Sequence, residues 1–175
     1  MLKRRILEIL LVLVAISVYA WMRQQSLPSD QTWLTLDSPR GEYIGQGRAW
    51  RFSSEGAEFK ADYPYKKAEL GVRVQVKGPG QDYFWLEFAA PHSQKLMPGT
   101  YSNAARFAFH DADQPGLDVS GCGRGNNRLQ GTFKVLEIAY GESGPTRLAI
   151  DFLQDGEGNR TPPLKGSVRF HSSVK

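Results

Sequence analysis

The sequence predicts an all-β domain, an antiparallel β-sandwich or related barrel of roughly eight to ten strands, preceded by one N-terminal membrane helix. Three observations predict this fold. Apolar and polar residues alternate with period two along much of the chain, clusters of Gly and Pro separate the alternating runs, and outside residues 6–22 no window of about ten residues keeps a helical period. Such alternation is typical of antiparallel strands with one buried face and one face in water.

The first 23 residues predict a membrane-targeting segment. Lys3, Arg4 and Arg5 precede an apolar run, residues 6–22, in which Glu8 is the only charge. Because the basic residues lie before this run, we expect the amino terminus to stay in the cytoplasm and the rest of the chain to cross the membrane. A run of about 17 residues is at the short end of what can span a bilayer.

Two outcomes stay open for this segment. Val18 and Ala20 satisfy the small-residue rule for signal cleavage, which would give a secreted domain. Tyr19, Trp21 and Arg23 suit a retained anchor instead, because aromatic and basic side chains settle at a membrane interface. We favour the anchor, and therefore a single-pass inner-membrane protein with a cytoplasmic N-terminus and its domain in the periplasm.

The rest of the chain divides into a tether and one domain. Residues 24–31 are polar and contain Pro28, which predicts a short tether, and residues 32–175 have a common single-domain size. Residues 1–23 carry +3 of the formal net charge of +4, so the domain itself is close to neutral. It has no basic stripe to follow a phosphate backbone, and we do not expect nucleic acid as a partner.

Strands are expected wherever the side chains alternate. The predicted strands are residues 33–36, 49–53, 57–61, 72–77, 82–88, 117–120, 132–140, 147–152 and 168–171. Turn chemistry separates them at residues 77–80, 98–99, 141–145, 156–159 and 161–163. Residues 132–140 alternate in two phases, first through Phe133 and Val135 and then through Leu136, Ile138 and Tyr140. This change of phase predicts a β-bulge.

The strand at residues 82–88 is apolar on both faces. Phe84, Leu86 and Phe88 face one way, and Tyr83 and Trp85 face the other. Either the strand is central and covered on both sides, or Tyr83 and Trp85 form an exposed platform that binds a sugar ring or a partner protein. Burial is the commoner fate of tryptophan, and both readings stay open.

The glycine-rich segment 121–127 contains a second group of candidates. Arg124, Asn126 and Asn127 could bind a carboxylate or sugar hydroxyls. The alternative is a wide turn in which Arg124 pairs with Asp118 or Glu137. The only cysteine, Cys122, lies in the same segment and cannot form an intrachain disulfide.

The sequence marks no catalytic residues. It contains no nucleophile elbow, HExxH motif or phosphate-binding loop, so we do not expect an enzyme, and no cofactor is expected. The densest cluster of potential metal ligands is His110, Asp111 and Asp113, with Asp118 close behind. Their spacing matches no known calcium loop, and polar surface at a turn is the alternative interpretation.

Several stretches resemble a group of uncharacterised bacterial exported domains. These stretches are residues 37–47, 98–101, 105–107, 115–117, 123–125 and 131–137. The resemblance covers nearly all of the domain and implies an exported β-rich fold without an assigned activity. It also implies a disulfide between two positions that hold Asn126 and Asp155 here, so this chain would lack that bond.

These observations favour a non-enzymatic, membrane-anchored binding or scaffold module in the bacterial envelope. The expected partners are the inner membrane, through residues 1–23, and either a membrane protein or a glycan. Two alternatives stay open: a hydrolase of envelope polysaccharide or peptidoglycan with an unmarked site, and an accessory subunit of a membrane protein complex.

Overall fold

Ten strands make up most of the chain that the computed structural model describes, residues 30–156 and 162–175. They are β1 (Gln31–Asp37), β2 (Ala49–Ser53), β3 (Glu58–Asp62), β4 (Val72–Lys77), β5 (Tyr83–Ala89), β6 (Gly99–Arg106), β7 (Gly116–Gly121), β8 (Leu129–Tyr140), β9 (Pro145–Gly156) and β10 (Leu164–Ser172). Four 3-10 turns lie between strands: η1 (Pro64–Lys66), η2 (Ala68–Leu70), η3 (Pro91–Ser93) and η4 (Phe107–Phe109). The all-β prediction is confirmed.

The predicted membrane helix, residues 1–23, and most of the predicted tether lie outside the described residues. Within residues 30–156 and 162–175, no helix has the length and apolar character needed to cross a membrane.

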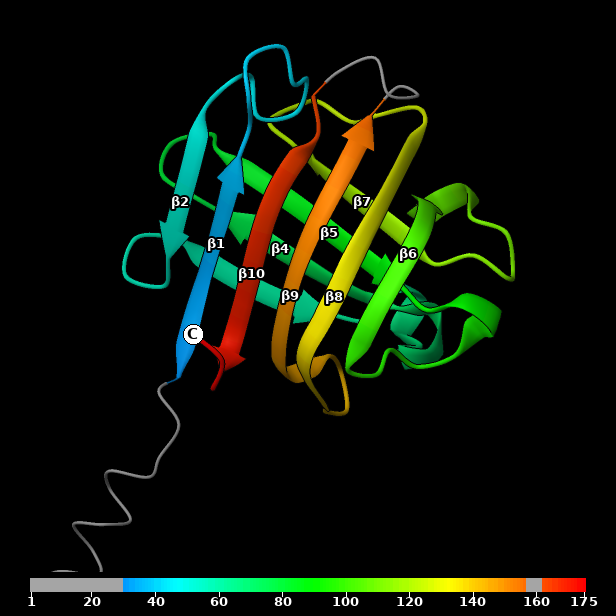
Figure 1. Cartoon of the computed structure of the whole chain (residues 1–175). Helices are drawn as coiled ribbons and strands as arrows, with labels where there is room; N and C mark the ends of the chain where they lie inside the picture. The colour runs from blue at the N-terminus through cyan, green and yellow to red at the C-terminus, as the bar shows by residue number, and fades with distance from the viewer. Residues whose placement is uncertain (1–29, 157–161) are drawn as a thin grey trace, which may run out of the picture.

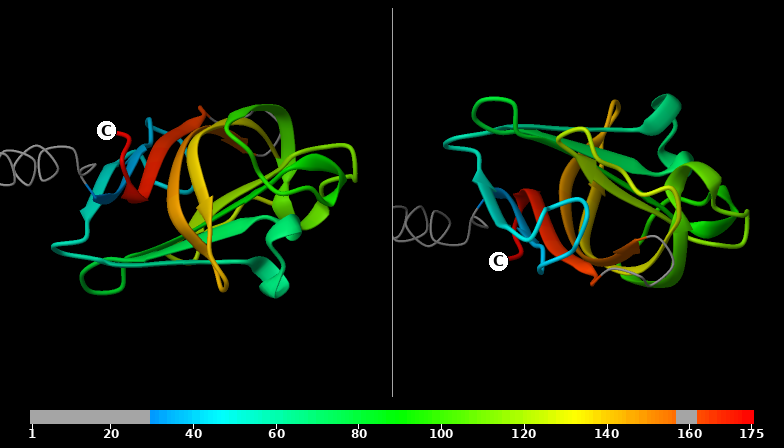
Figure 2. Two further views of the ribbon diagram at one scale, coloured as in Figure 1. Left: turned by 90° about the horizontal axis from the view of Figure 1, so that it is seen from below. Right: turned by 90° about the horizontal axis from the view of Figure 1, so that it is seen from above.

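The ten strands form one sheet in the order β2-β1-β10-β9-β8-β6-β7-β5-β4-β3. The sheet curls into a half-barrel, with β2, β1, β10, β9, β8 and β6 in a front layer and β7, β5 and β4 crossing behind them (Figure 1). The views from below and above show the two layers folded over a shared interior (Figure 2). Of the two predicted architectures, a sandwich or a related barrel, the structure is closer to the second, because the two layers are halves of one continuous curled sheet.

The sheet is mixed, which corrects the prediction of a purely antiparallel one. β6 and β7 run parallel, with Ala105 opposite Gly116 and Arg106 opposite Leu117. All other neighbouring strands are antiparallel. A parallel pair needs a crossover instead of a tight hairpin, and η4 with the turn that follows it supplies that connection.

The alternating runs bury their apolar faces as predicted. Val72, Val74 and Val76 of β4 point into the interior and are fully or almost fully buried. The register of β8 against β9 shifts between Val135 and Glu137, so the predicted bulge is confirmed. β6 was not predicted, because its sequence has no alternation and only Ala104 is buried.

The core lies between the two layers. Phe88 of β5 packs against Phe133 of β8 and Phe152 of β9, with ring centroids 5.2 Å and 5.9 Å apart. Gly166 of β10 leaves room for this packing, because a Cβ there would lie against the ring of Phe152. Each such buried side chain stabilises the fold by about 1.5–3 kcal/mol. The core therefore holds the back layer rigidly, and with it the side chains on its outer face.

Candidate binding groove

The outer face of the back layer carries side chains in three cross-strand rows. The row nearest the β4–β5 turn contains Glu58, Lys77 and Tyr83. The middle row contains Lys60, Gln75, Trp85 and Ser120. The row farthest from the turn contains Asp62, Arg73, Glu87 and Asp118. The rows follow from the period of two, since Phe84, Leu86 and Phe88 take the buried positions of β5.

Tyr83 and Trp85 form an exposed aromatic platform on this face. Their side chains are 41% and 44% exposed, although β5 is an interior strand with β4 and β7 on either side. The structure therefore supports the second of the two interpretations of this strand, because none of the described elements covers these two rings.

Tyr83 is held in place by the loop that follows β7. The backbone N–H of Gly123 donates to the Tyr83 hydroxyl at 2.8 Å, and the N–H of Cys122 donates to the Tyr83 carbonyl at 3.0 Å. Gly121 permits this close approach, since a Cβ at that position would lie against the Tyr83 carbonyl and the Phe84 ring. The phenol ring is thus fixed before any ligand arrives.

Trp85 is held from the opposite side by a guanidinium group. The Arg73 guanidinium carbon lies 5.4 Å from the indole centroid, within the range of a cation–π contact. Trp33 and Trp50 donate their indole N–H groups to Gln31 and to the Gly45 carbonyl, each at 3.0 Å. Trp85 makes no such bond within the described part of the chain, so its donor is free for a ligand.

The platform borders a groove of about 790 Å³. Its polar side chains come from β4 and the β4–β5 turn: Gln75, Lys77, Gln81 and Asp82. Cys122 and Gly123 line it from the β7–β8 loop. Cys122 is half-buried, and its thiol lies 3.5 Å from the Tyr83 carbonyl. The groove is thus a wide, open depression with an aromatic wall and a polar rim.

The third row, which is charged, lies beside the platform and holds Arg73 in position against Trp85. Arg73 binds Glu87 at 2.8 Å and lies 4.0 Å from Asp62, while Arg106 of β6 binds Asp118 at 3.2 Å. These side chains are largely buried, so the pairs are weakly screened by solvent. This row locks the guanidinium of Arg73 against Trp85.

Asp118 is the most buried acid of the row. Burial raises the pKa of its carboxyl, the bond from Arg106 lowers the pKa in part, and the neighbouring Glu87 carboxylate raises it again. Its Oδ1 atom is buried without a hydrogen-bond partner, in agreement with the dominant effect of burial. The carboxyl does not line the groove.

The η4 turn closes the other end of this outer face. A Cβ at Gly71 would lie against the ring of Phe107, and one at Gly116 would lie against the His110 ring. Ala89, an outward-facing residue at the end of β5, is buried. The η4 turn therefore covers this face on the side of the charged row that is away from the β4–β5 turn.

The segment 121–127 is placed differently from its prediction as one ligand-binding group. Arg124 donates to the carbonyls of Ile44 and Cys122, at 2.9 Å and 3.2 Å, and not to Asp118 or Glu137. Asn126 is only 2% exposed and packs against Gly156. Asn127 is exposed. None of these three residues lines the groove.

The candidate metal ligands do not converge. The Nδ1 atom of His110 lies 2.6 Å from the Phe107 carbonyl, and Asp111 and Asp113 are exposed on the turn that follows. In the described chain, no group of three or more His, Cys, Asp or Glu side chains is placed to hold a metal ion.

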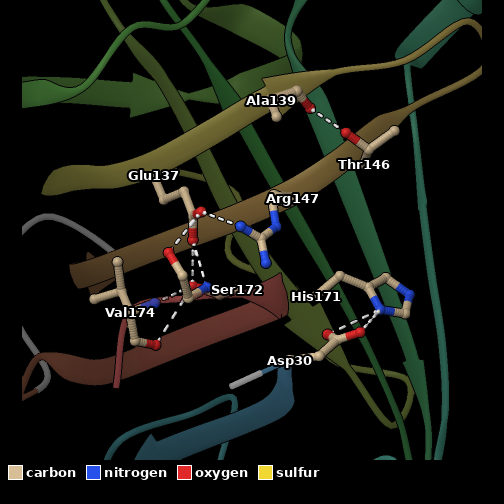
Figure 3. A network of polar contacts seen from close by, with 9 residues as sticks. Asp30, Glu137, Ala139, Thr146, Arg147, His171, Ser172 and Val174 are labelled. Carbon is tan, nitrogen blue, oxygen red and sulfur yellow. Dashed lines mark hydrogen bonds and ion pairs between the residues drawn. The ribbon is translucent and has the colours of Figure 1, made fainter. Parts of the chain in front are cut away.

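A second polar cluster lies on the outer face of the front layer (Figure 3). Glu137 of β8 accepts hydrogen bonds from the hydroxyls of Ser172 and Ser173, from the N–H of Ser173 and from Arg147. Burial raises the pKa of Glu137, but these bonds together outweigh it, and its pKa lies below the ordinary value. The cluster fastens the C-terminal residues to the sheet.

The polar residues of the groove were not predicted. Gln75 and Lys77 belong to the predicted strand at residues 72–77, and neither they nor Gln81 and Asp82 are among the candidate site residues that the sequence indicates. The signal was present, because the Gly-Pro-Gly turn at residues 78–80 joins two alternating strands as a hairpin. In this hairpin Gln75 is the cross-strand partner of Trp85, and Lys77 is the cross-strand partner of Tyr83, so each pair lies on the same face of the sheet.

No protein-family model, no curated protein and no solved structure matches this chain. Its similarity to the uncharacterised exported domains is thus an expectation from the sequence, and its function has to be inferred from the groove.

Proposed function

We propose that this protein is a non-enzymatic binding module of the bacterial envelope, anchored in the inner membrane by residues 1–23, whose groove binds a neutral glycan. The observation that carries the proposal is the platform of Tyr83 and Trp85, which is exposed and held in place from both sides. Aromatic surface of this kind is normally buried or used for binding.

The chemistry of the groove suits a sugar ring. The C–H groups on one face of a pyranose carry partial positive charge, and the face of an aromatic ring is negative, so the two stack. Gln75, Gln81 and Asp82 can accept bonds from hydroxyls, and Lys77 can donate to them. Tyr83 and Trp85 are two residues apart on one strand, about 6.7 Å along its axis. This spacing suits an extended chain of sugars.

Two other ligand classes fit less well. An extended peptide often adds to the edge of a sheet, but β4 and β5 already have a neighbouring strand on each side. A polyanion needs a groove of positive charge, whereas Lys77 is offset by Asp82. A neutral glycan needs neither an edge nor a net charge.

Binding is favoured over hydrolysis by the acidic groups at the groove. Among the described residues that line it, Asp82 is the single carboxylic acid, and no histidine lines it. A hydrolase needs a general acid and a general base that converge on the substrate. One carboxylate at the groove suits hydrogen bonding to a ligand better than such a pair.

The proposal is tested with the full chain in nanodiscs and oligomers of β-1,4-linked N-acetylglucosamine, followed by titration calorimetry. Trp85→Ala is expected to weaken binding by about tenfold, because an aromatic contact contributes about 1.4 kcal/mol. Tyr65→Ala is the matched control: its ring is 82% exposed but lies outside the groove.

Equal affinities for the wild-type chain and the Trp85→Ala variant would contradict the proposal. Shortening of the oligomers during the titration, followed by chromatography, would favour the hydrolase alternative.

A further inference from the structure

The end of the domain at which β1 begins carries two protruding apolar side chains. Tyr65 in η1 is 82% exposed, and Met97, just before β6, is 62% exposed. Both belong to connections between strands, and neither is among the described side chains that pack against the core. Two such side chains at one end of the domain, beside a tether to a membrane, are candidates for contact with another surface.

Strand pairing and one hydrogen bond place Met97 at that end. Gln31 at the start of β1 is paired with Ser172 at the end of β10, and Tyr140 at the end of β8 is paired with Pro145 at the start of β9. The start of β1 and the end of β8 therefore lie at the same end of the sheet. The Tyr140 hydroxyl donates to the Leu96 carbonyl at 2.7 Å, next to Met97.

Tyr63, the residue just before η1, places Tyr65 at the same end of the domain. The Tyr63 hydroxyl donates to the Gly141 carbonyl at 3.0 Å, and the Tyr63 and Tyr140 rings stack with centroids 6.1 Å apart. Tyr65 and Met97 thus flank Tyr140. We call residues 65–67 and 95–97 the tyrosine rim.

The backbone of η1 projects Tyr65 outward. Tyr65 and Lys66 have φ values of 54° and 59°, in the left-handed region that non-glycine residues rarely adopt. His92 and Ser93 in η3 share this conformation. Strained backbone of this kind persists where the surrounding structure holds it, often for a function.

The charge of the tyrosine rim is predominantly positive. Lys66, Lys67 and Lys95 are exposed, and no ion pair holds any of them within the described chain. Lys95 lies over the Tyr140 ring, 5.2 Å from its centroid. The acids nearest in sequence to the rim and to the β8–β9 turn are Glu69 and Glu142, and neither forms an ion pair within the described residues.

We propose that the tyrosine rim rests on the surface of the membrane in which residues 1–23 are anchored, with Tyr65 and Met97 among the headgroups and the three lysines against anionic phospholipid. This inference relies on the anchor of the proposed function. Aromatic and basic side chains are the types that settle at such an interface.

The length of the chain before Asp30 supports this orientation. Seven residues separate the end of the apolar run from Asp30, and they reach at most about 25 Å. The end of the domain that carries the rim is therefore the end held near the bilayer. β4 runs away from η1 toward Lys77, about 17 Å along the strand, so the groove stays clear of the lipid.

The test uses the full chain in vesicles of phosphatidylcholine with or without phosphatidylglycerol. Cys122→Ser removes the only native thiol, and an environment-sensitive dye is attached through Tyr65→Cys, Met97→Cys or Arg128→Cys. Arg128 is the control, because it is exposed and adjoins the opposite end of β8, about 36 Å from Tyr140.

We expect blue-shifted emission, several-fold brighter, at positions 65 and 97 but not at 128. The shift should be larger with phosphatidylglycerol and should decrease in the triple variant Lys66→Gln, Lys67→Gln, Lys95→Gln.

Three results would overturn the inference. Water-like emission at 65 and 97 in a chain that floats with the vesicles rejects the rim contact and leaves the anchor intact. A chain that does not float with vesicles rejects the anchor and the rim together. If the dye at positions 65 and 97 is protected from water in native membranes but not in lipid vesicles, the tyrosine rim contacts a partner protein instead of lipid.

Discussion

The two layers of the curled sheet each carry an arginine over a tryptophan on the outer face, and only one of these pairs is left open. In the front layer, Arg169 lies 4.9 Å from the Trp33 ring and is only 4% exposed. In the back layer, Arg73 lies 5.4 Å from the Trp85 ring, and Trp85 is 44% exposed.

The difference lies in what the chain places over each pair. Arg169 donates to the Lys175 carbonyl at 3.4 Å, so the C-terminal residues cross the front pair. Glu137 holds those residues through Ser172 and Ser173. Within residues 30–156 and 162–175, no corresponding segment crosses Trp85. The same motif thus stabilises the fold in one layer and presents an aromatic surface in the other.

The largest expected effect separates the two arginines. Arg169→Ala removes bonds to the Ile150 and Val168 carbonyls and to Asp151, and should lower the free energy of unfolding by about 2–4 kcal/mol. Arg73→Ala, at a more exposed site, should lower it by about 1 kcal/mol. Denaturant unfolding of both variants checks this, and equal losses would contradict the proposed contrast between the layers.

The pH dependence of stability should differ in sign between the layers. The pKa of Glu137 is lowered in the fold, so its stabilising effect should grow as pH rises through the acid range toward the ordinary value of 4.5. The pKa of Asp118 is raised above 3.8, so ionising this buried group should destabilise the fold as pH rises further.

The matched variants are Glu137→Gln and Asp118→Asn, measured by unfolding between pH 3 and pH 7. The stability advantage of the wild-type chain over Glu137→Gln should increase as pH rises from 3 toward the ordinary pKa of 4.5. The stability advantage of the wild-type chain over Asp118→Asn should decrease as pH rises across the measured range, from pH 3 to pH 7. Parallel curves for the two variants would show that the layers do not differ in this way.

The smallest effect concerns Cys122, which lines the open groove and is half-buried. A thiol reagent should modify it in the folded protein, several-fold more slowly than after denaturation. Bound glycan should slow the reaction further, as followed by mass spectrometry. Reaction only after denaturation would show that the groove is closed to solutes.

Alternation along the chain predicted all of the strands except β6, and the phase change in residues 132–140 located the bulge. This success has a local cause, since the side chains of a strand must alternate between core and solvent. β6 was not predicted because only one of its residues is buried, so its sequence does not alternate. Its backbone pairing with β7 and β8 holds it in the sheet.

The candidate site was predicted in part. Tyr83 and Trp85 were identified, but the sequence left their burial open. Arg124, Asn126 and Asn127 form a separate group of candidates for binding a carboxylate or sugar hydroxyls, and the structure places none of them at the groove. Arg124 bonds to Ile44, which is 80 residues away along the chain, and no local pattern reveals such a contact.

The sequence by itself determined every strand except β6, the direction in which the alternating side chains point, and the aromatic character of both faces of β5. Only the tertiary structure decided that one curled sheet forms both layers, that the C-terminal residues lie against Arg169, and that Trp85 is exposed. The physical reason is one of range. Side-chain direction depends on neighbouring residues, whereas the covering of a face depends on segments that are distant in the chain and meet only after the sheet has curled.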